Sequence, residues 1–157
     1  MLRLSSLLLF AATLTPTLAL DPGVYTICES DTVFVPRCLT STGFGGEVKM
    51  LPLDPSDEGA QLWFVRSMPG VDTFSYENIK TRCSAAKRAG TRFLVCSEEP
   101  TPFIVDRSHE VNYYVDTMDF NPRVRRMTHP PRSVSLLFTP QIPSPNSLFT
   151  FNRAVSN

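Results

Sequence analysis

One arrangement occurs three times after residue 20, and it constrains the fold more than any other feature. Each copy opens with a strand that contains an aromatic residue, continues through short turns, and closes with a second strand that carries an aromatic anchor. The opening strands lie near residues 24–27, 73–76 and 112–115. The anchors are Trp63, Phe103 and Phe149, which are 40 and 46 residues apart. A period of this length indicates internal repetition of a structural unit.

Turn residues divide the chain into short strands. Its 14 prolines and 7 glycines are spread along the sequence, and no segment repeats apolar residues at a sustained helical spacing. Strand candidates fall near 24–28, 37–41, 47–51, 61–66, 73–79, 81–86, 92–96, 102–106, 110–116, 123–128, 133–138 and 148–152. About four strands per unit predict an all-β protein, a β-trefoil of about twelve strands in three units. A β-sandwich is the alternative.

The first 19 residues have the features of a secretory signal peptide. Arg3 supplies a positive charge, residues 4–14 are mostly apolar, and Thr17-Leu18-Ala19 offers a cleavage site. The apolar run is shorter than the roughly 20 residues that span a bilayer, which argues against a membrane anchor. We therefore expect residues 1–19 to be removed and residues 20–157 to form a single secreted, extracellular β-trefoil domain with no membrane partner.

The charge balance narrows the choice of partner. The chain has 15 Lys and Arg residues against 15 Asp and Glu residues. A protein without a basic excess is not a general nucleic-acid binder, so we expect no nucleic-acid partner. We also expect the chain to be a monomer.

The four cysteines predict two disulfides, since an even number in a secreted chain is typical of such bonds. Three connectivities are possible. The hairpin-like spacing favours the pairs Cys28–Cys38 and Cys83–Cys96. A metal site is not expected, because the sequence lacks closely spaced cysteine pairs with nearby histidines.

The sequence contains no recognisable catalytic set, so we expect a binding protein that is not an enzyme and has no cofactor. The only histidines are His109 and His129, and no hydrolase elbow, zinc-protease motif or phosphate-binding loop is present. The segment 87–92, framed by Cys83 and Cys96, is a candidate loop for protease binding. Lys87 or Arg88 within it would suit the acidic pocket of a trypsin-like enzyme. A solvated basic turn is the simpler interpretation of the same residues.

The sequence resembles the fungal β-trefoil protease inhibitors of the mycocypin and cospin type. The similar motifs are Gly23-Val24-Tyr25-Thr26-Ile27, Gln61-Leu62-Trp63-Phe64-Val65 and Pro100-Thr101-Pro102-Phe103-Ile104. This resemblance implies inhibition of a secreted or foreign serine or cysteine protease through exposed loops. It points to Phe44 for a chymotrypsin-like pocket, to the glycine-rich loop around Gly45 for a papain-like cleft, and to Asn78 for an asparagine-specific protease. The signal peptide and the cysteines depart from the family pattern.

A weaker similarity links the chain to the ricin-type lectins, whose repeats carry Gln-x-Trp. Gln61-Leu62-Trp63 matches that motif once, and Cys38-Leu39 matches a Cys-Leu pair that those lectins often follow with Asp. Here Thr40 takes the place of that Asp, so we interpret Trp63 as a structural anchor. Glycan binding is the alternative function, and a secreted interaction protein with neither kind of target is the third.

Overall fold

The computed structural model describes residues 20–30, 35–57, 59–109, 111–118, 124–128, 136–140 and 147–154. These ranges contain twelve strands and no helix that is long and apolar enough to cross a membrane. The strands are β1 (Gly23–Glu29), β2 (Arg37–Thr40), β3 (Lys49–Pro52), β4 (Trp63–Ser67), β5 (Thr73–Asn78), β6 (Ser84–Lys87), β7 (Leu94–Ser97), β8 (Phe103–His109), β9 (Asn112–Met118), β10 (Val124–Thr128), β11 (Leu137–Pro140) and β12 (Leu148–Arg153). Each overlaps a strand range expected from the sequence.

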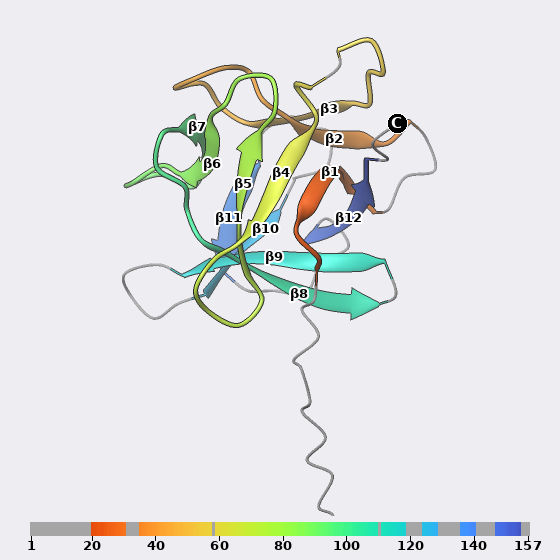
Figure 1. Ribbon diagram of the computed structural model, residues 1–157. Coiled ribbons are helices and arrows are strands. Elements are labelled where there is room, and N and C mark those ends of the chain that lie inside the picture. Colours follow the sequence, from red (N-terminus) through yellow and green to blue (C-terminus); the bar gives the residue numbers. More distant parts are fainter. Residues whose placement is uncertain are drawn as a thin grey trace, which may run out of the picture.

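Six of the strands close into a barrel. Antiparallel pairing runs from β1 to β4, β5, β8, β9 and β12, and β12 pairs again with β1. Figure 1 shows β8 and β9 crossing below the ends of β4 and β5. A closed ring leaves none of these strands with an unpaired edge, which removes the sites at which sheets aggregate.

The other six strands form three hairpins, one on each unit. The β2–β3 hairpin pairs with β1, β6–β7 pairs with β5, and β10–β11 pairs with β9. The hairpins also contact one another, because Glu47 forms a β-bridge with Val95 and the Phe138 amide donates to the Arg92 carbonyl over 2.8 Å. A six-stranded barrel with three hairpins is the architecture of a β-trefoil.

The strand register makes the three units equivalent residue by residue. Tyr25 lies opposite Trp63, Phe74 opposite Phe103, and Tyr113 opposite Phe149. All three closing anchors have no exposed surface. Each unit therefore contributes one buried aromatic pair to the barrel, which explains why the sequence repeats an aromatic opener and an aromatic closer.

The barrel interior is filled by side chains at positions that the three units share. Trp63, Phe103 and Phe149 form one equivalent set, Ile27, Tyr76 and Val115 form a second, and Tyr25, Phe74 and Tyr113 form a third. The rings of Tyr76 and Phe103 stack with their centroids 4.8 Å apart, so aromatic contact links two of these sets.

Two disulfides join the pairs that the hairpin spacing favours. Cys28 and Cys38 are direct cross-strand partners on β1 and β2. Cys83, just before β6, is bonded to Cys96 on β7. Each bond closes a short loop, for which the chain-entropy model gives about 2–3 kcal/mol of stabilisation.

Candidate functional site

A hollow of the described chain lies between the β2–β3 hairpin and the loop that leads into β4. Its volume is about 440 Å³. We call it the β3–β4 hollow, and it is lined by Thr40, Leu51, Pro52, Leu53, Asp54, Asp57 and Gln61. Three consecutive apolar residues of this set come from the end of β3, while the two carboxylates come from the following loop. The hollow thus combines an apolar wall with anionic hydrogen-bond acceptors.

Gln61 holds the two sides of the β3–β4 hollow together. Its Nε2 donates to Thr40 Oγ1 and to the Pro52 carbonyl, both over 2.9 Å, and its Oε1 accepts from the Asp54 amide over 2.9 Å. The Thr40 hydroxyl in turn donates to the Cys38 carbonyl. Gln61 and Thr40 are both buried. The polar atoms of Gln61 and Thr40 are therefore used in hydrogen bonds within the protein. The exposed hydrogen-bond acceptors of the hollow must come from other residues.

Asp54 supplies such an acceptor at the rim. Its Oδ1 receives hydrogen bonds from the Ser56 amide (2.9 Å) and the Ser56 hydroxyl (2.6 Å), which fixes the orientation of the carboxylate. The Ser56 hydroxyl, followed by the Ser56 amide, lowers the pKa of Asp54 below its ordinary value because both stabilise the ionised form. Asp54 consequently remains a charged acceptor under mildly acidic conditions.

Asp57 is the second carboxylate of the hollow, and it is held by a residue that does not line the hollow. Lys80 Nζ donates to Asp57 Oδ1, so an ion pair connects the β3–β4 loop to the turn after β5. Both side chains are about half exposed, and a pair of that kind contributes little to stability. Its effect here is to orient the carboxylate.

Trp63 takes no part in the β3–β4 hollow. The ring is fully buried, and its Nε1 donates to the Leu39 carbonyl over 2.8 Å. No aromatic ring lines the hollow. The sequence interpretation of Trp63 as an anchor fits this position. Sequence analysis did not identify Asp54 and Asp57 as site residues, although they lie seven and four residues before Gln61 of the Gln-x-Trp motif.

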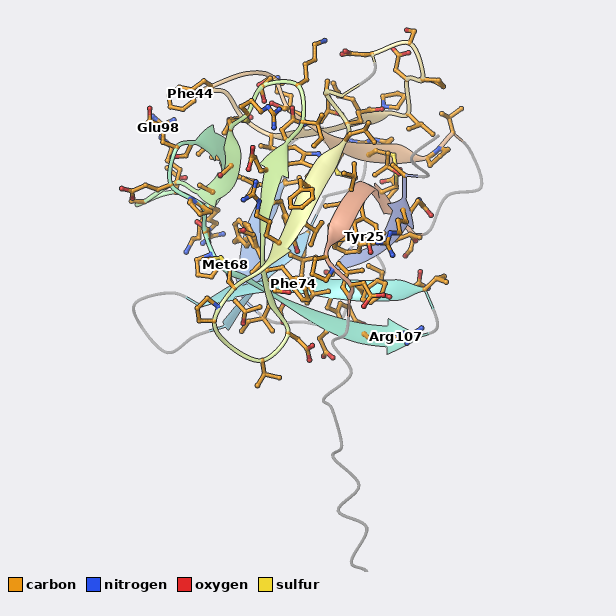
Figure 2. The ribbon with its side chains drawn as sticks, viewed as in Figure 1. Tyr25, Phe44, Met68, Phe74, Glu98 and Arg107 are labelled. Carbon is orange, nitrogen blue, oxygen red and sulfur yellow. A yellow bond between two sulfur atoms is a disulfide. The ribbon has the colours of Figure 1, made fainter. Side chains whose placement is uncertain are left out.

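The β2–β3 loop displays Phe44, whose side chain is 65% exposed. Figure 2 shows Phe44 at the outer edge of the molecule, on the side of the β6–β7 hairpin. The Gly45 amide donates to the Cys96 carbonyl, and the Cys96 amide donates to the Gly46 carbonyl, each over 2.9 Å. Positive φ angles at Gly43 and Gly45 form the turn. The backbone of Gly45 is therefore bonded to β7, and Phe44 is the group that this loop presents.

The basic loop expected to bind a trypsin-like protease is a tight hairpin turn between β6 and β7. Arg88 is exposed, while Lys87 ends β6 and is partly buried. The Arg88 carbonyl accepts from both the amide and the hydroxyl of Thr91, and Gly90 has a φ of 72°. The turn therefore exposes the charge of Arg88, while its own backbone is folded rather than extended.

Asn78 corrects one expectation, because it is not displayed for a protease. The residue ends β5 and has no exposed surface. Its Nδ2 donates to the carbonyls of Gly59, Ala60 and Leu62, each over 3.0 Å, and its Oδ1 accepts from the amides of Lys80 and Thr81. A short polar side chain that can bond five backbone groups is a structural connector, and the intact fold keeps it out of any protease cleft.

The described residues include no cluster of three or more histidine, cysteine or acidic side chains arranged to hold a metal ion. His109 is the last residue of β8, and His129 lies outside the described residues.

No protein-family model matches the sequence, and no curated protein matches it. The fold, in contrast, is similar to solved structures. The Rhizoctonia solani agglutinin shares 12% identity over 88% of this chain and 99% of its own, with a TM-score of 0.67. The Macrolepiota procera ricin B-like lectin in complex with lactose shares 11% identity over 88% of this chain and 100% of its own, with a TM-score of 0.66. The designed threefold-symmetric protein ThreeFoil shares 7% identity over 84% of this chain and 99% of its own, with a TM-score of 0.64. These likenesses agree with the barrel and hairpins described above and show that the chain has a β-trefoil fold.

Proposed function

We propose that this chain is a secreted carbohydrate-binding protein that holds a sugar in the β3–β4 hollow. One observation carries the proposal: two oriented carboxylates, Asp54 and Asp57, face an apolar wall in a hollow of about 440 Å³. Carboxylates accept hydrogen bonds from sugar hydroxyls, and the apolar wall of Leu51, Pro52 and Leu53 suits the C–H face of a pyranose ring.

The position of the β3–β4 hollow supports this proposal. It is built around Gln61 of the Gln-x-Trp motif and around Thr40, the residue that follows Cys38-Leu39. Ricin-type lectins often have an Asp at the position of Thr40. In this chain the acceptor comes instead from Asp54, on the other side of the same glutamine. The fold similarity to an agglutinin and to a lectin solved with lactose agrees with the same function.

A glycan array followed by calorimetry with the best ligand tests the proposal. We expect Asp54→Asn to weaken binding about tenfold or more, because it removes a charged acceptor while keeping the side-chain shape. Glu99→Gln is the matched control, since Glu99 is an exposed acid on the β7–β8 loop. Absence of any glycan ligand, or equal affinity of wild type and Asp54→Asn, would remove the proposal.

Protease inhibition through the β2–β3 loop is the second candidate. Phe44 is exposed, and the residues that follow it, Gly45 and Gly46, are fixed to β7 by backbone hydrogen bonds. The loop is also attached to a disulfide, because Ser41 Oγ lies 3.0 Å from Cys96 Sγ. A rigid loop loses less entropy on entering a cleft. Inhibition of chymotrypsin that Phe44→Ala abolishes and Arg88→Ala preserves would favour this function over sugar binding.

A further inference from the structure

A second hollow lies at the barrel end opposite the hairpins, and we call it the barrel-mouth hollow. Its volume is about 370 Å³, and it is lined by Leu20, Asp21, Tyr25, Arg107, Tyr113, Phe151 and Arg153. Figure 2 shows Tyr25 and Arg107 at the lower part of the molecule, away from Phe44. None of its residues belongs to the β3–β4 hollow, so an inference drawn here does not rest on the sugar site.

Aromatic rings form the inner wall of the barrel-mouth hollow. Phe151 meets Tyr25 and Tyr113 edge to face, with ring centroids 6.0 and 5.3 Å apart. Both tyrosines are largely buried, at 4% and 9% exposure. The Tyr25 hydroxyl donates to the Asp21 carbonyl over 2.7 Å. The Tyr113 hydroxyl forms no hydrogen bond within the described residues, and it is not among their buried unpartnered groups, so this donor is open to the hollow.

Two guanidinium groups stand at the rim. Arg153 lies opposite Tyr25 in the β1–β12 register, and Arg107 lies opposite Tyr113 in the β8–β9 register. Within the described chain Arg153 forms no ion pair, and its one hydrogen bond is a 3.5 Å contact from Nη2 to the Pro22 carbonyl. Gly23 packs against this group, since a Cβ there would make van der Waals contact with Arg153 Nε and Nη2 at 3.4 Å. The lining of the hollow thus includes two arginines and one carboxylate, Asp21.

The pairing of β4 with β5 shows that closing this end of the barrel does not require a tyrosine hydroxyl and a guanidinium group. The position equivalent to Tyr25 and Tyr113 is Phe74, which is fully buried and has no hydroxyl. The position equivalent to Arg107 and Arg153 is Ser67. An aromatic ring alone is therefore sufficient for packing, and the repeated tyrosine–arginine pair needs another explanation.

We propose that the barrel-mouth hollow binds an oxyanion, the carboxylate or sulfate group of an acidic ligand. Guanidinium groups form paired, charge-assisted hydrogen bonds with such groups, and the Tyr113 hydroxyl adds a neutral donor. The Phe151 ring offers an apolar surface to the carbon skeleton that carries the anion. Bound this way, the anion would meet the donor that lacks a partner and the guanidinium that lacks an ion pair.

Amide chemical shifts measured by NMR test this site with defined probes. Full-length protein expressed with its own leader and recovered from the medium is titrated with sodium glucuronate, sodium sulfate and glucose at constant ionic strength set with chloride. We expect saturable shifts around Tyr113 and Phe151 with both anions and none with glucose. Response to glucuronate alone would assign the site to carboxylates, response to sulfate alone to sulfates, and each supports an oxyanion site.

Substitutions separate this site from general charge effects. Arg153→Gln should weaken anion binding about tenfold, and Tyr113→Phe by a smaller factor, because a charged donor contributes more than a neutral one. Arg88→Gln removes the same charge from the β6–β7 hairpin and should leave the affinity unchanged. Equal affinities for Arg153→Gln and wild type, or shifts with glucose as large as those with the anions, would overturn the proposal. Asp54→Asn should not affect anion binding, so the proposal for the barrel-mouth hollow and the proposal for the β3–β4 hollow can be refuted independently.

Discussion

Replacing Asn78 by alanine should destabilise the fold more than any surface substitution. Asn78 bonds the carbonyls of Gly59, Ala60 and Leu62 and the amides of Lys80 and Thr81. It therefore connects the end of β5 to the segment that enters β4 and to the turn that precedes Cys83. Few other side chains could replace it, since the position demands a short group that donates on one side and accepts on the other.

The size of the effect follows from the partners that remain. Each of the three carbonyls still accepts a hydrogen bond from a backbone amide after the substitution. The donors are Leu62 to Gly59, Ser41 to Ala60 and Ile79 to Leu62, so each carbonyl loses only one of its two hydrogen bonds. The two amides lose their acceptor, which costs about 1–3 kcal/mol for a buried group and less where water can enter. With the lost packing of a fully buried side chain, we expect a decrease of about 3–4 kcal/mol in the free energy of unfolding, out of a typical 5–15 kcal/mol.

Urea unfolding followed by the fluorescence of Trp63, the only tryptophan, measures this decrease. Asn152→Ala on the exposed side of β12 is the control and should change stability by less than about 0.5 kcal/mol. Asn78→Asp gives a second signature, because its carboxylate would face three carbonyl oxygens. Its folded pKa should rise above the unfolded value, so this variant should gain stability as the pH falls. A loss below about 1 kcal/mol in Asn78→Ala would refute the reasoning.

Three further predictions follow from single groups. The buried Tyr76 hydroxyl has no hydrogen-bond partner in the described chain, so Tyr76→Phe should keep or raise the melting temperature; a clear decrease would contradict this. Gly45 has a φ of 75° with open space around it, so Gly45→Ala should cost about 1–2 kcal/mol in urea unfolding through backbone strain alone. Because hydrogen bonds from Ser56 lower the pKa of Asp54, its carboxylate stays charged as the pH falls. Sugar affinity measured by calorimetry should therefore be constant from about pH 7 to pH 5 and fall only at lower pH; a midpoint above about pH 5 would exclude Asp54 as the acceptor.

Local sequence determined much of the fold because each unit carries its own strand and turn signals. In the opening strand, side chains two residues apart share a face, and Tyr25 and Ile27 are both buried. The spacing of the cysteines favoured the two hairpin disulfides that the structure contains. The aromatic anchors occupy equivalent buried positions because a threefold barrel needs one such pair from each unit. These features depend on neighbours that are close in the chain or repeated along it.

The sites depended on contacts that the sequence does not display. Asp54 and Asp57 become a pair of acceptors only when Gln61 joins the end of β3 to the loop before β4. Arg107 and Arg153 are far apart in the chain, and they line one hollow because β8 and β12 flank β9 in the closed barrel. Asn78 was mistaken for a displayed residue, since its burial arises from three carbonyls that precede β4. A repeat in the sequence thus determines the barrel, whereas the closure of that barrel decides which polar groups meet and which are buried.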